Sequence, residues 1–158
     1  MSKTLVAYFS ATGTTAATAK YLSEALEADI YEIKPEVPYV KADLNWLNPL
    51  SRSTKEMNGK NSRPAIIKGD VDVSGYDTVY LGFPIWWYIA PTIINTFLES
   101  QDFSGKNIVL FATSGGSDFG KAVKKLQPSC PDAAIKEGIV FKGKPAKEDV
   151  ETWVKALG

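Results

Sequence analysis

The stretch Leu5-Val6-Ala7-Tyr8-Phe9-Ser10-Ala11-Thr12-Gly13-Thr14-Thr15 decides the fold, because an apolar run changes abruptly into hydroxyl side chains around one glycine. The apolar part predicts a buried strand, and the polar part predicts a tight loop. The residues that follow predict a helix, because apolar side chains recur at helical spacing from Ala19 to Leu26. A strand therefore passes directly into the N-terminus of a helix.

Such a junction is suited to hold an anion. The first N–H groups of a helix have no partner within it, and the helix dipole adds partial positive charge. Ser10, Thr12, Thr14 and Thr15 add hydroxyl donors, and Gly13 permits a close approach or a positive φ. The loop has no lysine or arginine, and it matches neither a nucleoside triphosphate loop nor a Gly-x-Gly-x-x-Gly fingerprint. We interpret it as a site for one terminal phosphate; the alternative is that the hydroxyls only cap the helix.

The rest of the chain alternates between strand and helix patterns. Further strands are predicted at Asp29 to Ile33, Tyr76 to Phe83, Ile108 to Ala112 and Gly138 to Phe141. Asp29 to Ile33 alternates apolar with polar residues, which is typical of an edge strand with one wet face. Helices are predicted after Pro91, after Gly120 and at the end of the chain. Five alternations predict an α/β protein of three layers, with a parallel sheet between helices.

The segment from Tyr39 to Ile67 is too long for a plain connection in a compact domain. We expect one or two helices in it. They would cover one face of the sheet; alternatively the segment is a lid that brings Trp46 or Tyr39 near a ligand.

The length of 158 residues predicts a single domain over residues 1–158. Lysine plus arginine and aspartate plus glutamate both number 18, so no basic surplus attracts nucleic acid or anionic lipid. No apolar run approaches the roughly 20 residues of a membrane span, and the start lacks the apolar core of a signal peptide. We expect a cytoplasmic protein.

The absence of histidine removes several classes of enzyme. The chain cannot build a histidine metal site, a Ser-His-Asp triad or a histidine general base. The single cysteine, Cys130, excludes an internal disulfide, and we expect an inert thiol because no second cysteine can resolve an oxidised one. A redox protein that takes its chemistry from an organic cofactor needs none of these groups.

The pattern aromatic-x-Ser-x-x-Gly-x-Thr at Tyr8, Ser10, Gly13 and Thr15 resembles the FMN-phosphate loop of flavodoxins. The chain is similar over essentially its whole length to the branch of flavodoxin-like proteins with a Pro-Ile-Trp-Trp loop and a Thr-Ser-Gly-Gly loop. The resemblance implies a doubly wound, five-stranded parallel sheet of order 2-1-3-4-5, which binds FMN beyond the carboxyl ends of strands 1 and 3. It places the loops Ser10 to Thr15, Pro84 to Tyr88 and Thr113 to Gly120 side by side.

Each loop suits a different part of FMN. The hydroxyl loop suits the phosphate, and Trp86 and Trp87 offer faces for the isoalloxazine ring, although adjacent tryptophans also occur in cores. The N–H groups of the third loop can reach the pyrimidine edge. The resemblance implies ring contacts from backbone groups of the second and third loops. The candidate cofactor-binding residues are Ser10, Ala11, Thr12, Gly13, Thr14, Thr15, Pro84, Ile85, Trp86, Trp87, Thr113, Ser114, Gly115, Gly116 and Gly120.

Two functions compete. One is an electron carrier that passes electrons through FMN to redox partner proteins or a small-molecule acceptor; the other is an NAD(P)H-dependent reductase of quinones or nitro compounds. A flavin-free binding module is disfavoured by the intact phosphate loop. Zero formal charge is unusual for a carrier steered to basic partners. Quinone reductases of this fold are generally longer and dimeric, so we expect a carrier that is a monomer or weak dimer.

The second loop bears on the number of electrons. In flavodoxins a glycine after the third strand lets a peptide flip toward the flavin when it takes up one electron. Phe83 to Pro91 contains no glycine. A bulky residue at positive φ costs about 1 kcal/mol or more, so we expect this chain to favour two-electron chemistry.

Overall fold

Five parallel strands form the central sheet in the computed structural model, which describes residues 3–10, 13–36, 64–67, 73–85, 90–114, 119–120, 122–143 and 145–157. The strands are β1 (Thr4–Tyr8), β2 (Asp29–Glu32), β3 (Thr78–Pro84), β4 (Asn107–Ser114) and β5 (Ala134–Lys142). They lie in the order β2-β1-β3-β4-β5, and every neighbouring pair is parallel. The predicted fold class and strand order are confirmed.

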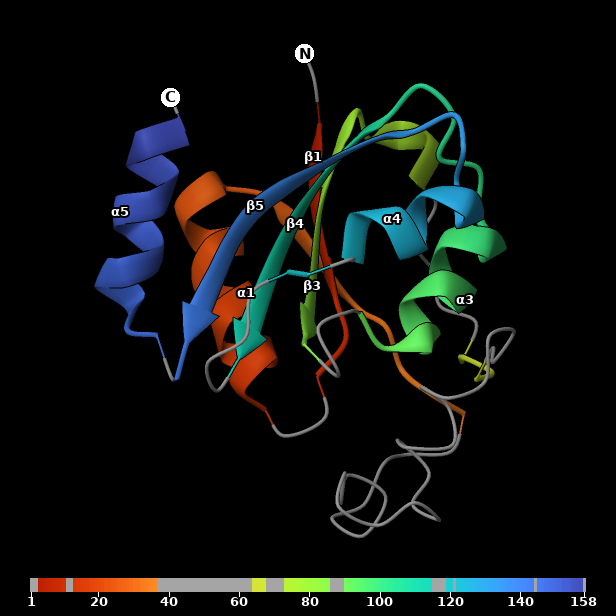
Figure 1. Ribbon diagram of the computed structural model, residues 1–158. Helices are drawn as coiled ribbons and strands as arrows, with labels where there is room; N and C mark the ends of the chain where they lie inside the picture. Colours follow the sequence, from red (N-terminus) through yellow and green to blue (C-terminus); the bar gives the residue numbers. More distant parts are fainter. Residues whose placement is uncertain are drawn as a thin grey trace, which may run out of the picture.

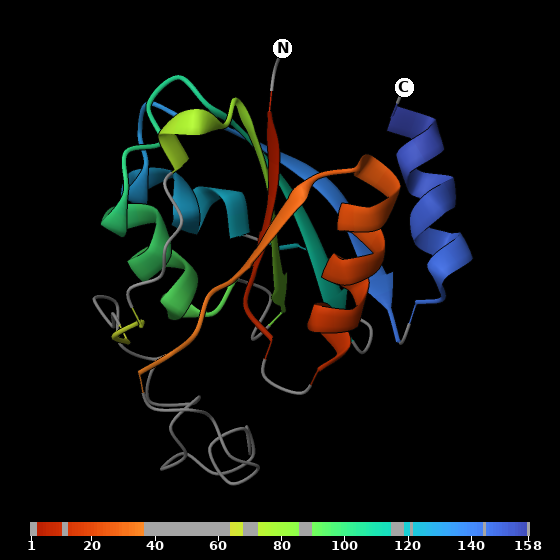
Figure 2. The ribbon, with the colours of Figure 1, turned by 180° about the vertical axis from the view of Figure 1, so that it is seen from behind.

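Helices cover both faces of the sheet. The α-helices are α1 (Thr14–Leu26), α3 (Thr92–Ser100), α4 (Ala122–Leu126) and α5 (Lys147–Leu157); short 3₁₀ helices are η2 (Val73–Gly75) and η3 (Gln127–Ser129). Figures 1 and 2 show α1 and α5 on one face and α3 and α4 on the other. None of the helices in the described ranges is long and apolar enough to cross a membrane.

The central strand β1 explains why the opening apolar run is continuous. Val6 belongs to the core beneath α1 and α5, whereas Leu5 and Ala7 belong to the core beneath α3. Successive side chains of a strand point to opposite faces, so a strand buried on both faces needs apolar residues at every position. The predicted strand is confirmed.

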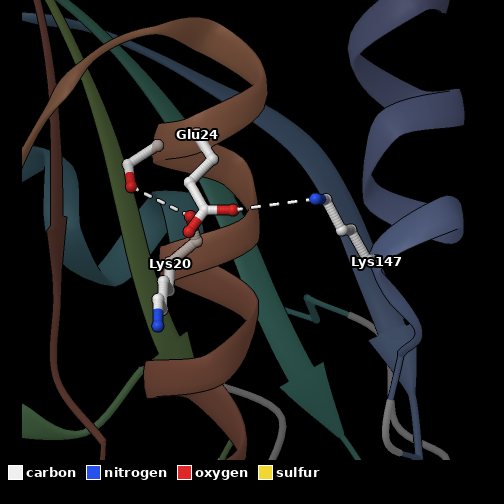
Figure 3. A network of polar contacts seen from close by, with 4 residues as sticks. Lys20, Glu24 and Lys147 are labelled. Carbon is white, nitrogen blue, oxygen red and sulfur yellow. Dashed lines mark hydrogen bonds and ion pairs between the residues drawn. The ribbon is translucent and has the colours of Figure 1, made fainter.

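Helix α5 packs on β3 and β5 through aromatic contacts near its middle, and it lies beside α1. The Trp153 ring meets Tyr80 and Phe141 edge to face, with centroids 6.0 and 6.1 Å apart. Figure 3 shows Glu24 of α1 facing Lys147 of α5, with Oε2 and Nζ 4.0 Å apart. Both charged side chains are about half exposed, so apolar burial contributes more to the packing than this ion pair does.

Strand β5 contains a bulge, and for this reason the strand predicted from the sequence is shorter than the observed one. Leu110 pairs with Glu137 and Phe111 pairs with Ile139, so Gly138 is the extra residue. A Cβ on Gly138 would overlap the carbonyl oxygen of Leu110, which explains the glycine. The strand begins at Ala134, four residues before the predicted start, because the glycine interrupts the ladder without ending it.

Strand β2 lies at the edge of the sheet with one exposed face, as predicted. Ile30 is 46% exposed, whereas Tyr31 and Ile33 contact the core beneath α3. Beyond β2, Pro35 forms an antiparallel bridge with Ile66, so the two ends of the segment between them lie next to each other. The helices predicted in this segment, and the cover or lid formed with Tyr39 or Trp46, lie outside the described residues.

Candidate functional site

The carboxyl ends of β1, β3 and β4 form the edge at which the three candidate loops begin. The strand arrows in Figure 1 point to this common edge, where α1 also starts. Tyr8, the last residue of β1, pairs with Gly82, and β3 and β4 continue beyond it to the pair Pro84 and Thr113. β3 and β4 therefore extend two residue pairs beyond the end of β1, where the first loop begins.

The loop before α1 has the geometry expected of an anion site. Gly13 is the N-cap of α1 with φ 95° and ψ −15°, and its N–H donates to Ser10 Oγ over 3.0 Å. Helix α1 has no side-chain cap and no acidic residue in its first turn. A Cβ on Gly13 would have no atom within 4 Å, so a ligand can approach there. The predicted positive φ is confirmed. Helix capping by the hydroxyls stays the alternative, because Ser10 Oγ accepts from the Gly13 N–H.

Thr15 and Thr113 meet in the interior, although the sequence assigned them to different parts of the ligand. Their Oγ1 atoms are 2.7 Å apart, and the two residues are only 1% and 6% exposed. Thr15 lies in the first turn of α1 and Thr113 near the end of β4. The first and third loops are thus joined by a buried hydrogen bond between side chains 98 positions apart.

Backbone hydrogen bonds join the second loop to the same point. The Ile85 N–H donates to the Thr113 carbonyl over 3.0 Å, directly after the last pair of β3 and β4. The Gly143 N–H donates to the Ser114 carbonyl over 2.8 Å. Pro84, Thr113 and Ser114 therefore end strands and do not begin loops as predicted. Proline and small hydroxyl residues resemble loop residues in a sequence, but here strand pairing continues through them.

The other candidate residues fall into two groups. Gly120 has φ 55° in the turn before α4, which accounts for the glycine, and its cofactor contact stays a prediction. Thr14 begins α1, and its carbonyl accepts from Thr18 Oγ1 over 2.9 Å. Six candidates lie outside the described residues: Ala11, Thr12, Trp86, Trp87, Gly115 and Gly116.

The described candidates form a neutral donor set. Ser10 lies just before α1, and Thr14 and Thr15 lie in its first turn, so that all three supply hydroxyl groups near the helix N-terminus. None of the described candidate side chains is ionisable. Nearby, burial and the charge of Glu32 raise the pKa of Tyr8, so its hydroxyl stays protonated at neutral pH. Neutral N–H and O–H donors at a helix start fit a phosphate group.

Comparison with known proteins agrees with this geometry. A family model described as flavodoxin matches residues 3–157. The chain therefore belongs to the flavodoxin family, and the expected family is confirmed. A comparison with curated proteins found no match.

Solved structures add relatives at two levels of similarity. A putative flavoprotein from Bacteroides uniformis ATCC 8492 is 49% identical, with a TM-score of 0.91 over 98% of each chain. One from Bacteroides eggerthii DSM 20697 is 46% identical, with a TM-score of 0.89 over 99% of this chain and 98% of that chain. A flavoprotein from Lactobacillus acidophilus NCFM, solved in complex with FMN, shares the fold at 20% identity, with a TM-score of 0.71 over 98% of this chain and 99% of its own. The match to the flavodoxin family supports FMN as the cofactor.

Proposed function

We propose that this protein binds FMN at the carboxyl ends of β1, β3 and β4 and carries electrons through it. Bound FMN would supply a reversible acceptor of electrons. The observation that carries the proposal is the position of Thr113 near the end of β4, where its hydroxyl contacts Thr15 and its carbonyl accepts from Ile85. Thr113 thus connects the ends of β3 and β4 to the first turn of α1, where the candidate loops adjoin.

The proposal assigns the phosphate to the start of α1. Gly13 leaves open space there, and the first turn contains no acidic side chain that would repel an anion. This loop provides for one phosphate and has no fingerprint for a pyrophosphate bridge. FMN, with its terminal phosphate, fits this donor set better than FAD does.

Identification of the bound flavin tests the cofactor. The protein is purified under native conditions, its flavin is released by denaturation, and the flavin is identified by mass spectrometry. Protein recovered without flavin is titrated with FMN and with FAD while flavin fluorescence is followed. We expect FMN in the first measurement and preference for FMN in the second. FAD alone, or no affinity for either flavin, would refute the assignment.

A reductase is the second candidate, because Phe83 to Pro91 contains no glycine to permit the peptide flip known from flavodoxins. This feature favours two-electron chemistry with a small-molecule acceptor. The test is NAD(P)H oxidation by the FMN-loaded protein in the presence of a quinone, with free FMN as control. A carrier oxidises NAD(P)H only after a separate reductase is added, whereas a reductase does so alone.

The partners follow from the same proposal. Electrons would reach the flavin from a redox protein and leave to a second protein or a small molecule in the cytoplasm. The equal numbers of acidic and basic residues give no strong field for steering, so association should depend little on salt. We propose that the protein acts as a monomer or weak dimer, without nucleic acid or membrane; sedimentation of the FMN-loaded protein tests the oligomeric state.

A further inference from the structure

We propose that Thr113 is a positioning residue for the phosphate end of the site: its hydroxyl donates to Thr15 Oγ1, which leaves the Thr15 proton for the phosphate of FMN. This inference rests on the FMN site proposed above. It gives a residue of the third loop, which the sequence assigns to the ring edge, a role at the opposite end of the cofactor.

The threonine pair has more protons than its own hydrogen bond uses. Two hydroxyl groups have two protons, and the hydrogen bond between Thr15 and Thr113 uses one of them. Among the described residues, no other hydrogen bond of either hydroxyl is present. The pair is buried, and a buried donor without an acceptor is costly. Within the described part of the chain, one O–H of the pair therefore has no acceptor, and a bound phosphate would supply one.

The chemistry of phosphate sets the direction of the hydrogen bond. Ionised phosphate oxygens only accept, so the hydroxyl that binds them must donate. Thr15 belongs to the first turn of α1, where the N–H groups also favour an anion, whereas Thr113 lies on β4. When Thr15 donates to the phosphate, its oxygen can only accept from Thr113. Hydrogen bonds arranged in such a chain polarise and strengthen one another.

Replacing Thr113 by valine isolates this hydroxyl. Valine keeps the branched shape of threonine and has a methyl group in place of the hydroxyl. The Thr113 carbonyl, which accepts from the Ile85 N–H over 3.0 Å, is retained. The link between the second and third loops therefore remains, and any change reports on the contact with Thr15.

The experiment compares FMN with riboflavin, which has the same ring system and no phosphate. Dissociation constants of both are measured by fluorescence for wild type, Thr113→Val, Thr113→Ser and Thr15→Val. We expect Thr113→Val to raise the Kd for FMN about tenfold and that for riboflavin less than about threefold. Thr113→Ser should keep the wild-type ratio of the two constants. In the Thr15→Val background, Thr113→Val should change that ratio no further.

Thr18→Val is the matched control. Thr18 is buried in the same helix, and its hydroxyl donates to the Thr14 carbonyl over 2.9 Å. We expect this variant to change thermal stability without changing the ratio of the two constants. Thermal unfolding of each flavin-free variant verifies folding, and Thr113→Ala is a second hydroxyl-free variant should valine not be accommodated.

The outcomes separate this inference from the proposed function. A wild-type ratio in Thr113→Val, or an equal loss of affinity for FMN and riboflavin, overturns the positioning role while the FMN site stands. Wild-type protein that binds no flavin overturns the proposed function, and this inference with it. A selective loss for FMN that Thr113→Ser restores supports both.

Discussion

Replacing Gly82 by alanine is expected to destabilise the protein, because the ring of Phe111 occupies the space that a Cβ needs. Gly82 of β3 pairs with Phe111 of β4 in the middle of the sheet. A Cβ on Gly82 would overlap ring atoms Cζ and Cε2 of Phe111 and lie 2.7 Å from Cε1. The backbone of Gly82 is outside the left-handed region, so alanine can adopt its conformation. The ring is therefore the source of the predicted cost.

The magnitude follows from how firmly the ring is held. Phe111 is 0% exposed and packs in the core that also contains Val6 and Leu22. Forcing an extra carbon into such a core costs about 1–3 kcal/mol. Without the clash, glycine to alanine at a compatible site stabilises by about 0.4–1 kcal/mol, since it restricts the unfolded chain. The sign of the change therefore tests the packing.

Urea denaturation of the flavin-free protein measures this change. Gly75→Ala is the matched control, because a Cβ there has no atom within 4 Å and its backbone is also outside the left-handed region. We expect Gly75→Ala to be neutral or stabilising and Gly82→Ala to be destabilising. In a Phe111→Leu background, Gly82→Ala should cost less. Gly82→Ala as stable as wild type would refute the reasoning.

Three further changes test other parts of the structure. Gly13→Ala should lower the unfolding free energy of the flavin-free protein by about 1–2 kcal/mol, because φ is 95° although space is free; an unchanged denaturation midpoint would contradict that backbone. Burial raises the pKa of Cys130 from 9.0 to about 11, so stability should fall between pH 9 and 11, where the unfolded thiol ionises first, and Cys130→Ala should remove this fall. Rapid labelling of native Cys130 by a thiol reagent at pH 8 would contradict its burial. Lys147→Gln should change stability by less than about 0.5 kcal/mol in thermal unfolding, because its ion pair with Glu24 is 4.0 Å long and exposed; a larger loss would show that the pair fastens α5 to α1.

The sequence predicts both the central strand of the sheet and the strand at its edge. The uninterrupted apolar residues of β1 indicate burial on both faces, and the glycine before α1 indicates a positive φ; both predictions are correct. At the edge strand β2, alternation predicts one exposed face, which the structure shows at Ile30. Periodicity shows which residues share a face, but it cannot show whether anything covers that face.

Contacts across the sheet could not be predicted from local pattern. Thr15 and Thr113 each belonged to a predicted loop, and the family resemblance placed those loops side by side. The hydrogen bond between the two hydroxyls depends on the strand register and on where α1 begins, which no local pattern encodes. An isolated glycine within a strand pattern can indicate a bulge, as Gly138 does here. The sequence pattern instead predicts that the strand starts at this glycine.

The same register connects the packing of the core to the site. The pair Gly82 and Phe111 lies two positions before the pair Pro84 and Thr113 on the same two strands. A side chain forced between β3 and β4 at Gly82 would displace Phe111, and the rigid ladder would transmit the displacement toward Thr113. Gly82→Ala should therefore lower the preference for FMN over riboflavin as well as the stability. In a Phe111→Leu background, Gly82→Ala should have a smaller effect on both the preference and the stability, because the clash is relieved and Thr15 and Thr113 are unaltered.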